Sequence, residues 1–126
     1  MGLVYAPITL SNPRDATITP MKVKALVDTG AITLCIPEHI AVQLNLEHIE
    51  KREVKTADDT IHVVPYAGPV KIQFENRTCF TGALILGNSI LIGAVPLEDM
   101  DLVVSSRHRK VTVNPDSPNI PTAIVK

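Results

Sequence analysis

Proline and glycine interrupt this chain too often for long helices. Ten prolines and six glycines are spread over 126 residues, and the runs between them are rich in valine and isoleucine. β-Branched residues favour extended backbone, and proline and glycine are the usual punctuation of turns. The sequence therefore predicts many short strands in a single domain. Their core is aliphatic, because the chain has only two tyrosines, two phenylalanines and no tryptophan.

The first third of the sequence predicts a hairpin followed by a short helix. Two extended runs, residues 3–10 and 19–28, flank a polar turn in which Asn12 and Asp15 are expected to bond the local backbone. In the second run apolar residues alternate with lysines, which indicates a half-buried strand that ends at an aspartate. After another short extended run, residues 37–46 begin with a proline and carry apolar residues four apart, as in a helix.

The rest of the sequence predicts a β-meander, one more short helix and a closing hairpin. The meander is expected to have a strand on each side of the polar tip "ADDT" and then two more apolar runs, one on each side of the turn at Asn76 and Arg77. The predicted segments are the meander over 53–86, an apolar run at 90–93, a helical stretch at 94–100, a hairpin over 101–115 and an extended or mobile tail over 116–126. We expect the domain to span residues 1–115.

The charge balance argues against a polyanionic partner. Twelve basic residues face thirteen acidic ones, and the basic cluster "RHRK" at 107–110 fits a solvated turn, so nucleic acid is not expected to bind. The start of the chain does not read as a secretory signal. The longest apolar segment, residues 83–97, is too short to span a membrane. These features predict a soluble, cytoplasmic protein without a membrane partner.

The sequence offers no strong metal or thiol site. Cys35 and Cys79 are too few for a disulfide scaffold and are expected to be buried small residues, with a disulfide between them as the alternative. A nucleophilic pair of Cys35 and His39 lacks a third orienting group. The remaining polar candidates, assigned no metal role, are His48, His62, His108, Glu98, Asp99 and Asp101. The last three are expected to favour a helix start after Pro96, and no metal or organic cofactor is predicted.

The stretch "VDTGA" places Asp28 at a strand end, before a hydroxyl residue and a glycine. Glycine permits close backbone approach, so this turn is able to hold a carboxylate rigidly. The flanking apolar segments predict that Asp28 is partly buried. A lone buried carboxylate is costly unless it is hydrogen-bonded or shares a proton with a second acid. An ordinary turn is the simpler alternative, and no other aspartate in the chain has a comparable setting.

Three stretches together resemble the retropepsin-like aspartic proteases. "ALVDTGA" at 25–31 resembles their catalytic loop, "ILIGAVPLEDM" at 90–100 resembles their later apolar segment and short helix, and "KTADDTIH" at 55–62 lies where they have a flap hairpin. The resemblance covers residues 3–115 as an ordered series. It implies an all-β fold, a closed or partly open barrel with one or two short helices, and an active site on the twofold axis of a homodimer.

The resemblance also assigns roles to individual residues. Asp28 would be the catalytic acid, Thr29 would bond the backbone of the partner subunit, and Gly30 and Ala31 would support the loop. Two Asp28 carboxylates would share one proton, because like charges at that distance cannot both ionise. The ionised member would take a proton from water while the other donates one to the scissile carbonyl.

Two features depart from the retroviral pattern. The tip formed by Ala57, Asp58 and Asp59 is acidic where retroviral flaps are glycine-rich and apolar, and the chain continues through a further hairpin after residue 100. That length is closer to the cellular and prokaryotic members. We therefore expect a homodimeric aspartic endopeptidase for extended peptides. A non-proteolytic peptide-binding or dimerisation module is the alternative, and a monomer with a structural Asp28 is the third reading.

Overall fold

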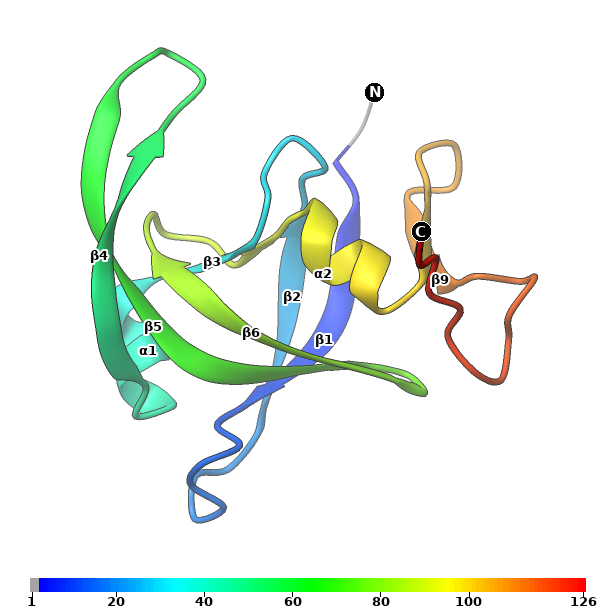
Figure 1. Ribbon diagram of the computed structural model, residues 1–126, viewed down its shortest axis with the longest axis horizontal. Coiled ribbons are helices and arrows are strands. Elements are labelled where there is room, and N and C mark those ends of the chain that lie inside the picture. Colours follow the sequence, from blue (N-terminus) through cyan, green and yellow to red (C-terminus); the bar gives the residue numbers. More distant parts are fainter. Residues whose placement is uncertain (1–2) are drawn as a thin grey trace.

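In the computed structural model, residues 3–126 are described, and they contain nine strands and two short helices (Figure 1). In chain order these are β1 (Tyr5–Ser11), β2 (Met21–Val27), β3 (Leu34–Ile36), α1 (Glu38–Gln43), β4 (Glu47–Lys55), β5 (Ile61–Phe74), β6 (Arg77–Ile85), β7 (Leu91–Ile92), α2 (Ala94–Asp99), β8 (Leu102–Ser105) and β9 (Lys110–Val113). The fold is all-β, as predicted, since the two helices are only six residues each.

Seven of these strands form one sheet that closes on itself. Its order is β1-β2-β7-β3-β6-β5-β4, and the end of β1 also pairs with β5 through Thr9–Gln73 and Leu10–Ile72. The closed ring therefore runs from β1 through β5, while β4 lies outside it, paired only with β5. Strands β8 and β9 form a separate two-stranded sheet. This arrangement confirms the predicted closed, partly barrel-like architecture.

Strand β7 lies between β2 and β3, and this placement positions the candidate site. β7 pairs in parallel with β2 and antiparallel with β3, so the two earlier strands do not pair with each other. The chain that leaves β2 must pass the end of β7 before it returns as β3. Residues 28–33 make that passage. Asp28 therefore lies where β2, β7 and β3 meet.

Aliphatic side chains fill the barrel, as the composition predicts. Leu10, Leu34, Ile36, Ile72 and Ile92 are fully buried in one apolar cluster with the inner residues of both helices. The predicted alternation in β2 is confirmed, because its lysines are exposed and its apolar partners are buried or half-buried. No helix within residues 3–126 has the length and apolar character needed to cross a membrane.

Two details differ from the sequence-based expectations. The apolar runs on either side of Gly68 form one 14-residue strand, β5, because its register shifts between Ala67 and Val70 and this irregularity accommodates Pro69. Helix α2 starts at Ala94 and not after Pro96, so Glu98 and Asp99 lie at its C-terminal end. The predicted hairpins and helix α1 are confirmed.

Candidate active site

The loop over residues 28–33 is held by backbone hydrogen bonds from two neighbouring elements. The Asp28 N–H donates to the carbonyl of Ile92 in β7 at 3.0 Å. At the other end, the N–H groups of Ala94 and Val95 donate to the carbonyls of Ala31 and Ile32 at 2.8 and 2.9 Å. The first turn of α2 and the end of β7 thus fix the loop on both sides of its tip.

Gly93 makes this close contact possible. A Cβ atom at this position would lie 2.6 Å from the carbonyl oxygens of Ala31 and Thr33, which is too close for any side chain. Its own backbone, with φ −95° and ψ −173°, is extended and open to other residues, so the contact alone demands glycine. Gly93 lies in the stretch "ILIGAVPLEDM" that resembles the retropepsin-like proteases, but the resemblance assigned it no role. Its only signal was a glycine directly after an apolar run.

The Asp28 side chain is exposed in the single chain, together with Thr29 and Gly30. The prediction of partial burial is therefore wrong for one copy, because the flanking strands enter the core while the tip between them projects from it. Oδ1 accepts the Gly30 N–H at 2.9 Å, and among residues 3–126 no other side-chain hydrogen bond reaches this carboxylate. A Cβ at Gly30 would lie 3.2 Å from the same oxygen, so glycine keeps the carboxylate uncrowded.

The predicted flap residues form the tip of the hairpin between β4 and β5. Backbone bonds join Thr56 to Thr60 and Asp59 to Thr56, each at 3.0 Å. Asp58 Oδ1 accepts the Thr56 hydroxyl at 2.5 Å and the Thr60 N–H at 3.2 Å. These bonds, the Thr56 hydroxyl first, lower the pKa of Asp58 below its ordinary value. Asp59 has a left-handed φ of 63° and pairs with Lys55 at 3.3 Å.

The flap hairpin and the Asp28 loop project toward the same side of the molecule (Figure 1, top). The hairpin extends well past the barrel, and nearly all of β4 is exposed. Within the described residues, no hydrogen bond joins the 28–33 loop to the 56–60 tip. The fold therefore gathers the predicted catalytic and flap residues on one side and leaves them separate from each other.

The two cysteines are free and poorly suited to nucleophilic chemistry. Burial, and then the negative charge of Asp28, raise the pKa of the Cys35 thiol. Burial and the neighbouring Asp99 raise the pKa of Cys79 to about 12. Both thiols are therefore protonated at neutral pH. No group of three or more His, Cys, Asp or Glu side chains that could hold a metal ion occurs in the part of the chain that the structure describes.

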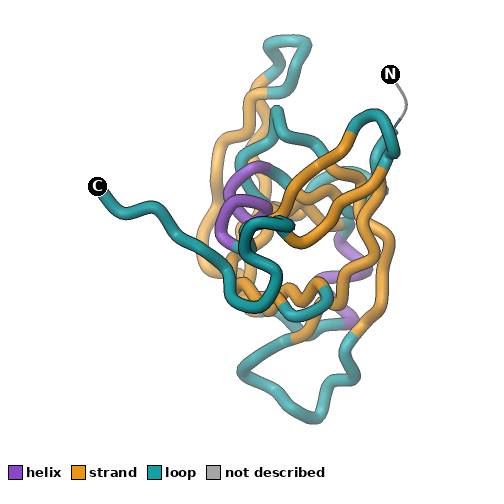
Figure 2. Tube along the Cα trace, turned by 90° about the vertical axis from the view of Figure 1, so that its right-hand side faces the viewer, coloured by secondary structure: helices purple, strands orange, loops and turns teal. Residues whose placement is uncertain are grey.

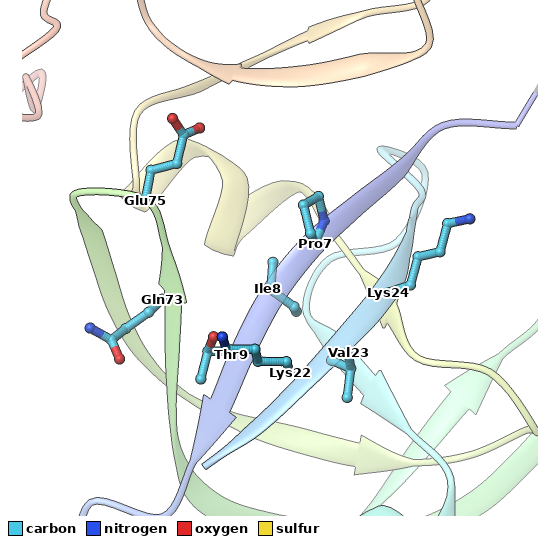
Figure 3. Close-up of a pocket in the computed structure, with 8 residues that line it drawn as sticks. All are labelled: Pro7, Ile8, Thr9, Lys22, Val23, Lys24, Gln73 and Glu75. Atoms are coloured by element: carbon cyan, nitrogen blue, oxygen red, sulfur yellow. The ribbon is translucent and has the colours of Figure 1, made fainter.

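Two surface hollows lie outside the predicted site. One, of about 500 Å³, spreads over β1, β2 and the end of β5, and Figure 3 shows Lys22, Gln73 and Glu75 among its lining side chains. The other, of about 290 Å³, lies between the start of α1, the base of the flap hairpin and the end of β6, where His48 and Glu38 line it. Neither is lined by the Asp28 loop or by the flap tip.

Comparison with solved structures identifies the fold. The retroviral protease-like domain of Ddi1 from Leishmania major is similar to this chain with a TM-score of 0.60 and 14% sequence identity, over 91% of this chain and 90% of that one. The protein Lpg0085 of unknown function from Legionella pneumophila aligns with a TM-score of 0.42 and 14% identity, over 80% of this chain and 91% of that one. No family model and no curated protein matches the sequence. The similarity to the Ddi1 domain, together with the closed sheet, shows a retropepsin-like fold.

Proposed function

We propose that the chain is an aspartic endopeptidase that acts as a homodimer on extended peptide segments. The observation that carries this proposal is the setting of Asp28. Its carboxylate is exposed, uncrowded and mounted on a loop that β7 and α2 immobilise. A structural aspartate in a turn needs no such external support, whereas a catalytic group must be held in a fixed geometry.

The exposure of Asp28 supports a two-copy site. Peptide hydrolysis by this chemistry needs one ionised and one protonated carboxyl, and a single copy offers only one Asp28. A twofold axis beside the loop would bring a second Asp28 within hydrogen-bonding distance, roughly 2.6–3.2 Å between oxygens. The second copy would also exclude solvent from the first. Dimerisation would thereby supply the burial that the sequence led us to expect.

The reaction follows from two carboxyls that share one proton. The ionised Asp28 takes a proton from a water molecule, whose oxygen attacks the scissile carbonyl carbon. The protonated Asp28 of the partner subunit donates its proton to the carbonyl oxygen, giving a tetrahedral diol. When the diol collapses, the carboxyl that is now ionised takes a proton from a diol hydroxyl, the C–N bond breaks, and the carboxyl that is now protonated donates its proton to the leaving amine. The pair titrates as a unit, so the rate should fall when both carboxyls ionise.

The tip formed by Ala57, Asp58 and Asp59 would act as the flap over the bound peptide. Among residues 3–126 β4 pairs only with β5, so its outer edge has free backbone groups, and Ile61 and Val63 on the same hairpin are exposed. An extended substrate with apolar side chains fits such a surface, since strands recognise extended peptides through backbone hydrogen bonds and side-chain contacts. Thr29 would bond the partner's backbone beside the twofold axis.

Replacing Asp28 with asparagine tests the proposal. Asn keeps the shape and the acceptor for the Gly30 N–H but cannot exchange the proton, so we expect peptide cleavage at mildly acidic pH to fall roughly 10³-fold or more. Circular dichroism and sedimentation should be unchanged. Asp15→Asn is the matched control, because Asp15 also accepts a backbone N–H two residues on, in the distant β1–β2 turn.

Full activity of Asp28→Asn would overturn the proposal. Absence of cleavage in the unmodified dimer across a peptide library, with retained peptide binding, would favour the alternative, a retropepsin-like binding or dimerisation module. The acidic, internally bonded flap tip is the feature that favours this alternative. A chain that remains monomeric at micromolar concentration would leave Asp28 as a structural turn residue.

A further inference from the structure

The flap hairpin leaves the barrel at Tyr66. Strand β5 pairs with β4 along the hairpin, but its pairing with β6 begins only at Tyr66, which lies opposite Leu84. Among the described residues, 61–65 therefore have β4 as their sole partner strand. In both views the hairpin projects past the strands of the barrel (Figure 1 and Figure 2, top). Its orientation depends on how the chain is held at Tyr66.

The backbone ladder is irregular on the barrel side of this position. The register shifts between His48 and Glu50 in β4 and between Ala67 and Val70 in β5. Such irregularities bend a strand and interrupt its hydrogen bonds. Above them the β4–β5 ladder is regular, but a two-stranded hairpin is only marginally stable on its own. Backbone pairing alone therefore fixes the angle between the hairpin and the barrel only weakly.

The Tyr66 ring joins the two sides of this irregular band. A Cβ atom at Gly82 in β6 would lie 2.1 Å from Cζ and 2.2 Å from the hydroxyl oxygen of Tyr66, so the ring occupies the space that a side chain would need there. On the hairpin side, the Arg52 guanidinium lies over the same ring, with its carbon 3.5 Å from the ring centroid. That distance is within the range of a cation–π contact. The ring thus contacts β6 of the barrel and β4 of the hairpin at once.

Arg52 is itself oriented by Glu50, the residue that pairs with Tyr66. Arg52 Nε donates to Glu50 Oε2 at 2.9 Å. The two side chains are 45% and 53% exposed, and an ion pair in solvent adds little stability by itself. The effect of this pair is geometric, because it holds the planar guanidinium over the ring.

A row of half-buried side chains leads from Tyr66 to the strand that precedes Asp28. Residues paired in neighbouring strands point to the same face of a sheet. The row consists of Tyr66, Leu84, Cys35, Leu91 and Leu26, each paired with the next. Leu26 precedes Asp28 by two residues, and burial, followed by the charge of Asp28, raises the pKa of Cys35 within the row. A tilt of the hairpin at Tyr66 would therefore change the space between the flap tip and the face that leads to Asp28.

We propose that Tyr66 is a positioning residue that fixes the angle of the flap hairpin to the barrel. Its ring packs against Gly82 and lies under Arg52, so the hairpin cannot tilt without breaking one of these contacts. The proposal rests on the proposed function, since this angle sets how the tip at 57–59 stands over a peptide at Asp28. Tyr66 acts through the tip and takes no part in the proton transfers.

Amide hydrogen exchange of the full chain, followed by NMR, tests the contact without a substrate. Tyr66→Leu removes the ring and keeps an apolar side chain, and Gly82→Ala fills the space that the ring occupies. We expect both to speed exchange in the ladder between residues 51 and 64 about tenfold or more, because a hairpin that is held less firmly opens more often. Exchange in the β1–β2 ladder should not change. Tyr66→Phe keeps the ring and should exchange like the unmodified chain.

The two ion pairs of β4 provide a matched control. Arg52→Gln removes the cation over the ring and should speed exchange in the same ladder several-fold. Arg14→Gln breaks the exposed pair with Glu47, which has the same 2.9 Å distance, and should leave exchange unchanged. If Tyr66→Leu does not fold, Arg52→Gln decides, because it changes only an exposed side chain.

Three results of the exchange experiment would overturn the proposal. Faster exchange throughout the chain would show that Tyr66 contributes only to overall stability. Unchanged exchange in Tyr66→Leu, or exchange in Tyr66→Phe as fast as in Tyr66→Leu, would show that the ring does not hold the hairpin. Equal effects of Arg52→Gln and Arg14→Gln would remove the role of the stacked cation.

Cleavage kinetics measure the consequence for the reaction. In Tyr66→Leu we expect KM to rise more than kcat falls, because a tilted flap holds the peptide less well, and Tyr66→Phe should keep the unmodified values. Asp28→Asn should instead lose kcat while its hydrogen exchange stays normal. An unchanged KM in Tyr66→Leu would overturn the positioning role.

The two measurements also separate this proposal from the proposed function. If the unmodified chain cleaves no peptide but the Tyr66 variants show the selective change in exchange, the endopeptidase is refuted and the Tyr66 contact is kept. Cleavage without a selective change in exchange would refute only the role of Tyr66. The absence of both would refute both proposals.

Discussion

The loop that carries Asp28 and the tip that carries Asp58 share one local bond and differ in everything around it. In each, a carboxylate oxygen accepts the N–H two residues further on, from Gly30 at 2.9 Å and from Thr60 at 3.2 Å. The Asp28 loop is also bonded to β7 and α2. Among the described residues, the bonds of the tip lie within residues 55–60. The same turn chemistry thus appears in an immobilised loop and in a free-standing one.

The difference indicates a division of roles. A catalytic carboxylate needs a fixed position, and the backbone bonds from buried elements supply it. A flap must open and close over a substrate, and a tip that depends only on its own residues can move without disturbing the core. Backbone amides of Asp28, Ala94 and Val95 should therefore exchange with solvent far more slowly than those of Thr56, Asp59 and Thr60.

The largest expected effect comes from Gly93→Ala. A methyl group 2.6 Å from the carbonyl oxygens of Ala31 and Thr33 must displace the loop or α2, and such overpacking costs about 1–3 kcal/mol. Denaturant unfolding should show this loss of stability. Peptide cleavage should fall as well, because the displaced loop carries Asp28.

Gly87→Ala is the control for the Gly93 variant. Gly87 has a left-handed φ of 76° and open space around its Cβ position, so alanine there costs about 1–2 kcal/mol of backbone strain without a clash. We expect some loss of stability and no specific loss of cleavage. If Gly93→Ala were neutral in both measurements, the external support of the Asp28 loop would be unimportant.

Much of the fold could be predicted because its signals are local. The alternation in β2 and the proline before α1 each act over a few residues. The turn residues behave as expected too, since Asn12 and Asp15 accept backbone N–H groups two residues on. The order of the three matched stretches then led to the barrel. The closing β1–β5 pair is long-range and became visible only in the structure.

The site was predicted less completely, because its support comes from distant residues. The need for glycine at position 93 arises from a loop some sixty residues earlier in the chain, and nothing near Gly93 in sequence reveals it. Asp101 was read as part of an acidic group near a helix start, yet it anchors the segment after β9. The exposure of Asp28 was missed because apolar neighbours in sequence do not define burial at a loop tip.

A smaller effect is expected from Thr56→Val at the flap tip. Valine keeps the shape but removes the hydroxyl that Asp58 and the Thr60 carbonyl accept. The free energy of unfolding should change by less than about 0.5 kcal/mol, because the tip is exposed and away from the core. Cleavage efficiency should fall several-fold if the closed tip orders the flap over the substrate.

Thr17→Val provides the matched control for Thr56→Val. Thr17 donates the same kind of hydroxyl bond to Asp15, in the turn between β1 and β2. Stability should again be nearly unchanged, and cleavage should stay at the unmodified level. Equal loss of cleavage in both variants would remove any special role of the flap tip, and strong destabilisation by Thr56→Val would show that the tip is not free-standing.

The smallest expected effect is the response of the tip to acid. Hydrogen bonds from Thr56 and Thr60 lower the pKa of Asp58, so the ionised form is favoured in the folded tip. The stability that these bonds add to the folded state is fully present above the ordinary aspartate pKa of about 3.9, and it is lost as the pH falls through the lowered pKa. A carboxyl NMR titration should place the pKa of Asp58 below about 3.9. Thr56→Val should raise the Asp58 pKa and leave the pKa of Asp15 unchanged.

An Asp58 pKa that Thr56→Val does not move would show that the Thr56 hydroxyl is not the bond that orders the tip. The contrast with the externally supported Asp28 loop would then rest on backbone bonds alone.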